Sequence, residues 1–263
     1  MAHISATILT YNEEKHIADC IHSLQGIADE IIVVDSFSTD STPEICKRLG
    51  CEVTQRAMAG YGAQRQYATT LTSHHYVLAI DADEVLSPSL RASLMKLKNE
   101  GFTHRGYSFS RLNFYCGVPI RHCGWYPDIQ VRLFDKRYAN WDLRDVDERV
   151  IFHDNIVPHH IDGDILHYRC DTPEEYTTTQ SKHAALMAKL ILAKGSEIKP
   201  LEPYLEGAKS FIKCFIGEKG IMDGTEGREI SLRRYHLTLA AWKAARAKQL
   251  NDKQKQTQQN STK

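Results

Sequence analysis

Two aspartates, Asp81 and Asp83, follow a short apolar run and are separated by one residue. Side chains at positions i and i+2 of an extended chain point the same way, so we expect both carboxylates on one side of the backbone. Such a pair is repulsive unless a cation lies between the two charges. Mg²⁺ or Mn²⁺ held by one or two carboxylates can bridge diphosphate oxygens and neutralise the charge of a leaving diphosphate. The alternative is a pair of solvated carboxylates at a strand end.

Polar clusters also follow two earlier apolar runs. Thr10, Asn12 and Glu13 come after the first run, and the segment 35–40, which begins with Asp35, comes after the second. Each cluster alone is equally typical of a helix cap. If the runs are parallel strands, however, their carboxyl ends meet at one edge of the sheet, where ligands of such sheets bind. The sequence therefore predicts one polar site built from three loops.

Residues 1–100 alternate apolar runs with amphipathic helical patterns, as βαβ units do. We expect strands at 4–9, 30–35, 52–55 and 76–81, and helices at 13–25, 42–49, 64–71 and 88–99. This alternation predicts an α/β fold with parallel strands. Short aromatic-rich strands are expected at 106–167 and helices at 173–250, followed by a disordered polar tail at 251–263.

Composition limits the class of protein. The chain has 263 residues, of which 42% are apolar, enough for one core and a smaller helical appendage. It lacks a long apolar run, a basic leader and CxxC spacing among its seven cysteines, so we expect a cytoplasmic protein. The formal net charge is zero, but residues 201–263 carry twelve Lys and Arg against seven Asp and Glu. A basic flank of this kind suits either an anionic membrane or nucleic acid.

The polar clusters and the runs before them resemble the ordered signatures of family 2 glycosyltransferases with the GT-A fold. The matching segments are Ile8-Leu9-Thr10-Tyr11-Asn12-Glu13, Ile32-Val33-Val34-Asp35 through Asp40-Ser41-Thr42, and Leu78-Ala79-Ile80-Asp81-Ala82-Asp83-Glu84. Two later segments, Gly124-Trp125-Tyr126-Pro127-Asp128 and Gln130-Val131-Arg132-Leu133-Phe134, look like the branch of lipopolysaccharide inner-core glucosyltransferases.

The resemblance implies a GT-A domain, with a mostly parallel, Rossmann-like sheet flanked by helices and a helical C-terminal extension. We expect the catalytic domain at 1–172, with a nucleotide-sugar-binding half at 1–105 and an acceptor-side half at 106–172, and the extension at 173–250. The implied activity is an inverting, metal-dependent transfer of a hexose, glucose by analogy, from a UDP-sugar to a saccharide hydroxyl. The acceptor by analogy is the lipopolysaccharide inner core.

The donor-site residues also follow from the resemblance. Thr10, Asn12 and Glu13 would line the nucleotide pocket, Asp35 would accept a hydrogen bond from uracil, Asp81 would approach the ribose, and Asp83 would hold Mn²⁺ or Mg²⁺. His167 resembles a late histidine that completes the metal site, although a lone histidine is often structural. Arg65 would lie near the donor phosphate or sugar; the alternative is an ordinary surface arginine.

An inverting transfer needs a base for the acceptor hydroxyl. Glu148, in the segment 146–148, resembles the glutamate of a Val-His-Glu pattern with aspartate where histidine is expected, and Asp128 is the second candidate. Glu148 could instead pair with a neighbouring arginine. Arg132 would either steady the diphosphate or pair with Asp128.

Apolar and basic side chains share the C-terminal helices. The apolar ones are Phe211, Ile212, Phe215 and Ile216, followed by Leu232, Tyr235, Leu239 and Trp242. Such a face fits peripheral contact with the inner face of a membrane and a lipid-anchored acceptor, so we expect no nucleic-acid partner. The alternatives are packing on the rest of the protein and homodimerisation.

Three other functions share parts of the pattern. A haloacid-dehalogenase-like phosphatase also places aspartates at i and i+2, but after its first strand. A nucleotidyltransferase shares the donor fold, but it usually has a glycine-rich basic loop where residues 10–15 are acidic and lack glycine. A non-catalytic nucleotide-sugar-binding protein is the third.

Overall fold

The computed structural model describes residues 2–144 and 147–261. The chain divides into two compact units: Met1–Leu112 with Pro127–Tyr168, and Asn113–Tyr126 with Arg169–Lys263. The segment 113–126 therefore groups with the C-terminal helices, although we expected it in the acceptor-side half of the catalytic domain. Strands β6 and β11 each begin in the first unit and end in the second.

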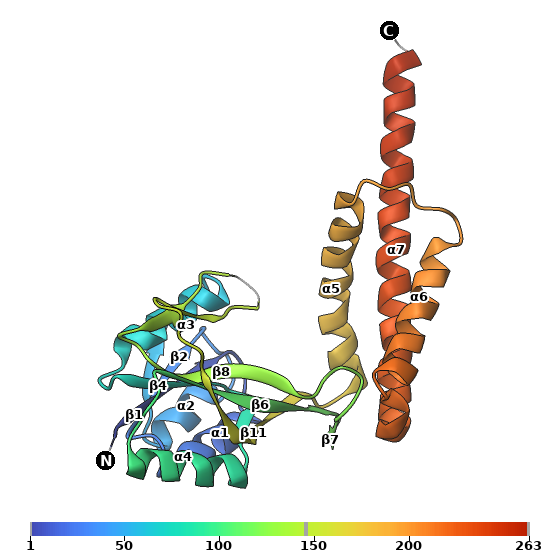
Figure 1. Ribbon diagram of the computed structural model, residues 1–263. Coiled ribbons are helices and arrows are strands. Elements are labelled where there is room, and N and C mark those ends of the chain that lie inside the picture. The colour runs from blue at the N-terminus through green and yellow to red at the C-terminus, as the bar shows by residue number, and fades with distance from the viewer. Residues whose placement is uncertain (1, 145–146, 262–263) are drawn as a thin grey trace. The chain divides into compact units, whose positions relative to one another are not determined.

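The first unit is an α/β structure (Figure 1). Its strands are β1 (Ile4–Thr10), β2 (Glu30–Asp35), β3 (Glu52–Gln55), β4 (Tyr76–Asp81), β5 (Glu84–Leu86), β6 (Gly106–Tyr115), β8 (Asp128–Asp135), β9 (Ala139–Trp141), β10 (Val150–Phe152) and β11 (His159–Cys170). Its helices are α1 (Ile17–Leu24), α2 (Thr42–Arg48), α3 (Tyr61–Leu71) and α4 (Pro88–Glu100).

The sheet has the order β3-β2-β1-β4-β8-β6-β11-β5. Strands β3, β2, β1 and β4 are parallel, whereas β8 runs antiparallel to β4 and to β6. The register places Thr10 beside Asp35 and Leu9 beside Asp81. The three loops predicted to form one site therefore leave the sheet at one edge, and the α/β fold class is confirmed.

Burial of apolar faces explains these elements. Every residue of β1 is buried, as expected for a central strand covered on both faces. Helix α1 buries Ile17, Ile21 and Leu24 at helical spacing against the sheet. This helix begins four residues later than predicted, because the backbone amides of Glu13 and Glu14 bind the neighbouring loop instead of entering the helix.

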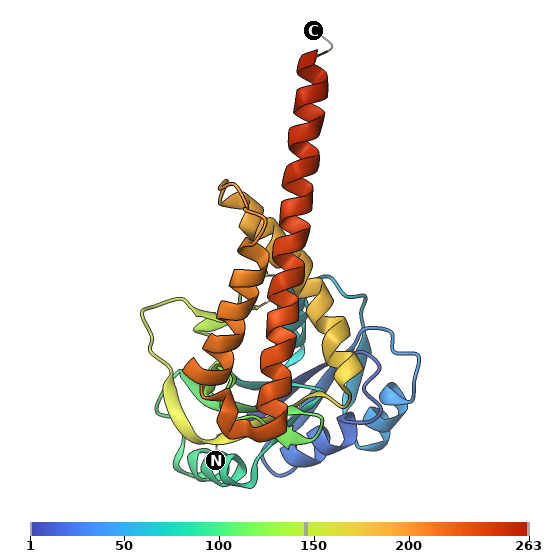
Figure 2. The same ribbon diagram turned by 90° about the vertical axis from the view of Figure 1, so that its right-hand side faces the viewer.

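The second unit is helical. It contains β7 (Val118–Pro119), α5 (Pro173–Ala193), α6 (Glu202–Ile212), a π-helical turn (Lys213–Gly217), a 3₁₀ turn (Gly220–Asp223) and α7 (Gly224–Ser261). Helix α7 packs against both α5 and α6 (Figure 2). It continues to Ser261, so the disordered tail predicted at 251–263 is wrong over its described part. Lys and Gln are good helix formers, and the segment contains neither Gly nor Pro.

Two residues of the apolar stripe predicted on the last helix, Tyr235 and Trp242, pack within this unit, whereas Leu232 is exposed. Trp242 lies against the cluster formed by Ala188, Ile191 and Ala245, and a Cβ at Gly207 of α6 would lie 3.0 Å from the Tyr235 ring. In the parts of the chain that are described, no helix combines the length and the apolar character needed to cross a bilayer.

Candidate active site

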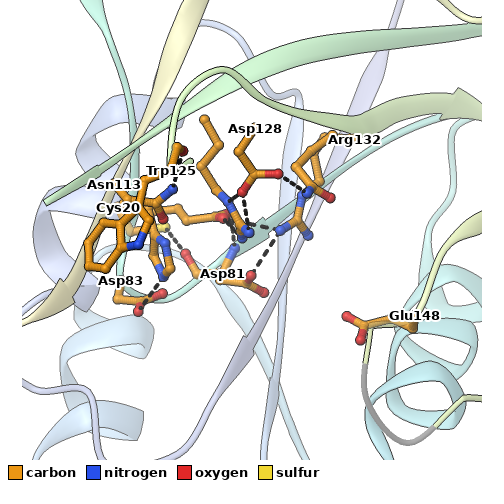
Figure 3. Close-up of polar contacts among 12 residues, drawn as sticks. Cys20, Asp81, Asp83, Asn113, Trp125, Asp128, Arg132 and Glu148 are labelled. Atoms are coloured by element: carbon orange, nitrogen blue, oxygen red, sulfur yellow. Dashed lines mark hydrogen bonds and ion pairs between the residues drawn. The ribbon is translucent and has the colours of Figure 1, made fainter. Parts of the chain in front are cut away.

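Asp81 and Asp83 leave the end of β4 in different directions. The strand ends at Asp81, and Asp83 lies in the turn that leads to β5, so the alternation of an extended chain does not reach it. The prediction that both carboxylates point the same way is therefore wrong. Figure 3 shows the two aspartates beside Asp128 and Arg132 of β8, with Glu148 approaching from a separate segment.

Both oxygens of the Asp81 carboxylate are bound by arginines. Arg65 lies 2.5 Å from Oδ1, and Arg132 lies 3.0 Å from Oδ2. Burial alone would raise the pKa of Asp81, but the charges of Arg65 and Arg132 outweigh burial and hold this pKa well below its usual value. Asp81 is therefore a fixed negative charge at the edge of the sheet.

A second carboxylate, that of Glu84, is fully buried next to Asp81 and Arg132. Its Oε1 accepts hydrogen bonds from Arg111 and Arg132, both at 3.1 Å, and its Oε2 accepts one from the Asp81 amide. Arg111 in turn contacts Asp128 at 2.7 Å. Arg132 was predicted either to steady the diphosphate or to pair with Asp128. In the structure Arg111 pairs with Asp128, and Arg132 forms an ion pair with Asp81.

Glu84 and Arg111 were not among the predicted site residues. Glu84 directly follows Asp83 in the sequence, and Arg111 interrupts an aromatic-rich strand. A charged residue within a buried strand is the available signal, because such a side chain is rarely buried without a partner.

We expect Glu84→Gln to lower the free energy of unfolding by about 3 kcal/mol, because it leaves two buried arginines with one fewer negative partner. Urea unfolding followed by circular dichroism measures this loss. Glu100→Gln, at an exposed glutamate at the end of α4, is the control. Equal unfolding midpoints for the two variants would contradict the supporting role of Glu84.

Arg65 also reaches Glu148. Its Nε lies 2.5 Å from Oε1 of Glu148, and its guanidinium lies 4.7 Å from the centre of the Trp141 ring. The Arg65 side chain is only 4% exposed, so it is not an ordinary surface arginine. These groups line a polar cleft of about 390 Å³ together with Arg111, Gln130, Arg132, Asp147 and Arg149. Val146, in the predicted motif before Glu148, lies outside the described residues.

Close backbone contact holds the segment that carries Glu148. Gly62, in the first turn of α3, donates its amide to the Arg144 carbonyl at 3.0 Å. A Cβ at Gly62 would lie 2.1 Å from the Asp142 carbonyl oxygen, closer than side-chain carbons approach. The absence of a side chain therefore allows the segment to lie on α3, next to Arg65.

We expect Gly62→Ala to displace this segment and cost about 1–3 kcal/mol of stability, because a methyl group cannot enter without moving backbone. The variant should also loosen the contact between Arg65 and Glu148. Thermal melting is the measurement. Gly217→Ala, where an added Cβ meets nothing within 4 Å, is the control, and unchanged behaviour of both variants would refute the contact.

Asp83 meets His167 across two strands. Strands β5 and β11 pair so that His167 lies opposite Glu84, and Nε2 of His167 lies 3.1 Å from Oδ2 of Asp83. Adjacent ligands of an octahedral ion with metal–ligand distances of about 2.1 Å lie roughly 3 Å apart. The 3.1 Å separation is that of a direct hydrogen bond between the two side chains, and it is also compatible with two ligands of one cation. An imidazole nitrogen suits Mn²⁺ better than Mg²⁺, which prefers oxygen.

The loops after β1 and β2 are tied to each other. The Asn12 amide donates to Ser38, the Thr39 amide donates to Asn12, and the Glu13 amide donates to Thr42, each at 2.8 Å. The capping residues thus join two loops instead of beginning their own helices. This arrangement gives the edge of the sheet a fixed shape beside the cleft.

Asp35 is fully buried below these loops. Its carboxylate accepts hydrogen bonds from the Ser38 amide at 3.0 Å, from the Ser38 hydroxyl, and from Gln55 at 3.2 Å. Seven buried side-chain polar atoms of the described residues have no hydrogen-bond partner, and two of them, Thr10 Oγ1 and Arg132 Nε, belong to residues of this edge. A bound ligand or water is one kind of partner that satisfies such atoms.

The chain is similar to known glycosyltransferases. Residues 5–121 match the model of glycosyl transferase family 2. An uncharacterized glycosyltransferase of Rickettsia typhi is 28% identical over 86% of this chain and 81% of its own length. The lipopolysaccharide core biosynthesis glycosyltransferase LpsC of Rhizobium meliloti is 28% identical over 70% of each chain.

Among solved structures, glucosyl-3-phosphoglycerate synthase of Mycobacterium tuberculosis, in complex with Mn²⁺, UDP and glucosyl-3-phosphoglycerate, matches at 26% identity. The match covers 43% of this chain and 44% of that one, with a TM-score of 0.36. The segment 5–121 belongs to glycosyltransferase family 2, and the family resemblance read from the sequence is confirmed.

Proposed function

We propose that the protein is an inverting glycosyltransferase that transfers a hexose from a UDP-sugar to a hydroxyl of a saccharide acceptor. The observation that carries this proposal is the cleft in which Glu148 lies beside Asp81, Arg65 and Arg132 at the carboxyl edge of the parallel strands. Ligands of parallel sheets bind at this edge. The cleft offers a carboxylate that can take a proton and a wall of fixed charge.

Glu148 is the better candidate for the base. Its side chain is 12% exposed and lines the cleft, and Arg65 orients it. Asp128 does not line the cleft and is held by Arg111 and by Gln130 at 2.6 Å. In the transfer, the acceptor oxygen attacks the anomeric carbon, its proton passes to Glu148, and the bond to the UDP oxygen breaks on the opposite face.

Asp83 and His167 would hold the divalent metal, for which their spacing fits. When bound, the cation would neutralise negative charge on the diphosphate. Thr10, Asn12 and Glu13 would surround the nucleotide at the joined loops. Uracil would reach Asp35 by replacing Gln55, an exposed side chain that makes the longest of the contacts to that carboxylate.

The acceptor proposed is a sugar of the lipopolysaccharide inner core, with glucose as the transferred hexose. Support comes from the relative whose name places it in lipopolysaccharide core biosynthesis. Because such a core is attached to lipid, we further propose a cytoplasmic enzyme that contacts the membrane peripherally through its basic C-terminal helices. It acts alone or as a homodimer.

Radiolabelled UDP-sugars offered with and without Mn²⁺ test the proposal. Transfer of label to a purified core oligosaccharide, with inverted anomeric configuration shown by NMR, is the expected result. UDP binding without transfer or hydrolysis of any hexose donor would instead identify a non-catalytic nucleotide-sugar-binding protein.

A further inference from the structure

The turn between α6 and α7 exposes four large apolar side chains. Ile212, Ile216, Ile221 and Met222 are 54%, 65%, 62% and 66% exposed. Single exposed apolar residues are ordinary on a protein surface, but four large ones within residues 212–222 are unusual and can serve as a docking element. The turn lies where α6 ends and α7 begins (Figure 2). We refer to residues 212–222 as the tip.

Packing fixes these side chains in an outward position. The inner side of the tip is filled by Cys214 and Gly220, both buried. A Cβ at Gly220 would lie 2.7 Å from Sγ of Cys123, and a Cβ at Gly227 would lie 1.9 Å from the Gly220 carbonyl oxygen. Since there is no space below the turn, it cannot rotate its apolar residues inward. Their exposure is a property of the folded unit.

Positive charge surrounds the apolar side chains. Lys213, Lys219 and Arg228 are exposed, and Lys219 and Arg228 make no ion pair with any described residue. Of the nearby acidic groups, Glu218 contacts Arg234 at 2.5 Å and Asp223 contacts His122 at 2.8 Å, whereas Glu226 meets the Thr225 hydroxyl and makes no ion pair with any described residue. Within the described part of the chain, two unpaired basic side chains, Lys219 and Arg228, therefore outnumber the one unpaired carboxylate beside the apolar residues.

We propose that the tip is a membrane-docking element that inserts its four apolar side chains into a bilayer containing anionic lipids. Apolar side chains enter the headgroup and acyl boundary, while lysine and arginine remain at the level of the anionic headgroups. A second copy of this chain is a poorer partner, because a two-fold interface would place the same basic residues against each other.

The role of this docking, which is to bring the enzyme to a lipid-anchored acceptor, rests on the proposed function. The docking itself does not depend on that function. This proposal narrows the membrane contact from the C-terminal helices as a whole to the turn between α6 and α7. Tyr235 and Trp242 of the α7 stripe are used in packing against α6 and α5.

Vesicle flotation of the full-length protein tests the tip. We expect it to float with vesicles of phosphatidylcholine and phosphatidylglycerol and much less with phosphatidylcholine alone. The double variant Ile216→Glu and Ile221→Glu should lower the vesicle partition coefficient by roughly 100-fold, since full burial of each side chain contributes about tenfold or more. Leu186→Glu, on α5 and 54% exposed, is the matched control and should float like the unmodified protein. Unchanged melting temperatures show that each variant is folded.

A charge variant separates the two parts of the contact. Lys219→Glu with Arg228→Glu should weaken flotation with the anionic vesicles and leave the weak binding to neutral vesicles unchanged. Equal flotation of the unmodified protein and the Ile216→Glu, Ile221→Glu variant overturns the proposal. So does a variant that converts a dimer to a monomer in light scattering while its flotation stays the same. Sugar transfer to a deacylated acceptor is measured separately. If the protein floats with vesicles but transfers no sugar, the proposed enzymatic function is refuted and the proposed membrane docking of the tip is not.

Discussion

Replacing Glu148 with glutamine is expected to lower turnover by roughly 10²–10⁴-fold while UDP binding stays close to that of the unmodified protein. The amide keeps the size of the carboxylate and can still accept a hydrogen bond from Arg65. It cannot take the proton of an acceptor hydroxyl. Single-turnover transfer rates and UDP titration calorimetry measure the two quantities independently.

Two controls make the Glu148 result specific. Asp147→Asn changes the neighbouring carboxylate of the same cleft, and asparagine tolerates its backbone φ of 56°. This control should retain most activity. Asp128→Asn tests the other candidate base: full turnover in Glu148→Gln combined with a large loss in Asp128→Asn would move the role to Asp128.

Removal of the Asp83 carboxylate should abolish transfer and also the part of UDP affinity that depends on Mn²⁺. Asp83→Ala leaves only the imidazole of His167 in the proposed pair, whereas Mg²⁺ and Mn²⁺ in such sites are held through at least one carboxylate. The side chain is 26% exposed and lies in a turn, so we expect the melting temperature to change little. UDP titrations with and without Mn²⁺ separate metal-dependent from metal-independent binding.

Asp162→Ala is the matched control, because Asp162 is an exposed aspartate on the strand that carries His167. His167→Ala should weaken Mn²⁺-dependent UDP binding in the same direction as Asp83→Ala. If Asp83→Ala transferred sugar at the normal rate, Asp83 would not be a metal ligand.

Local patterns in the sequence were enough to predict the parallel half of the sheet. The expected bounds of β2, β3 and β4 agree with those observed, because each is an apolar or β-branched run ended by a polar loop. The edge shared by Thr10, Asp35 and Asp81 then followed from the parallel arrangement. Helix α4 was predicted within one residue of its ends, whereas α3 begins three residues earlier than predicted.

The partners of the charged residues could not be predicted in the same way. Arg65 and Glu148 are 83 positions apart, and their contact depends on how the segment after β9 lies on α3. Asp83 turns toward His167 only because β11 pairs with β5. Glu84 was overlooked because its burial is decided by two arginines on other strands. Tertiary contacts, which leave no local signature, decide all three.

The guanidinium of Arg65 joins two segments that the chain keeps far apart, since it binds Asp81 on one side and Glu148 on the other. The positions of the two carboxylates are therefore linked through one guanidinium. Loss of either carboxylate would remove one of the two anionic partners of Arg65. Free energies measured for changes at the two carboxylates will consequently not add, and their difference from additivity measures how tightly the two halves of the cleft are coupled.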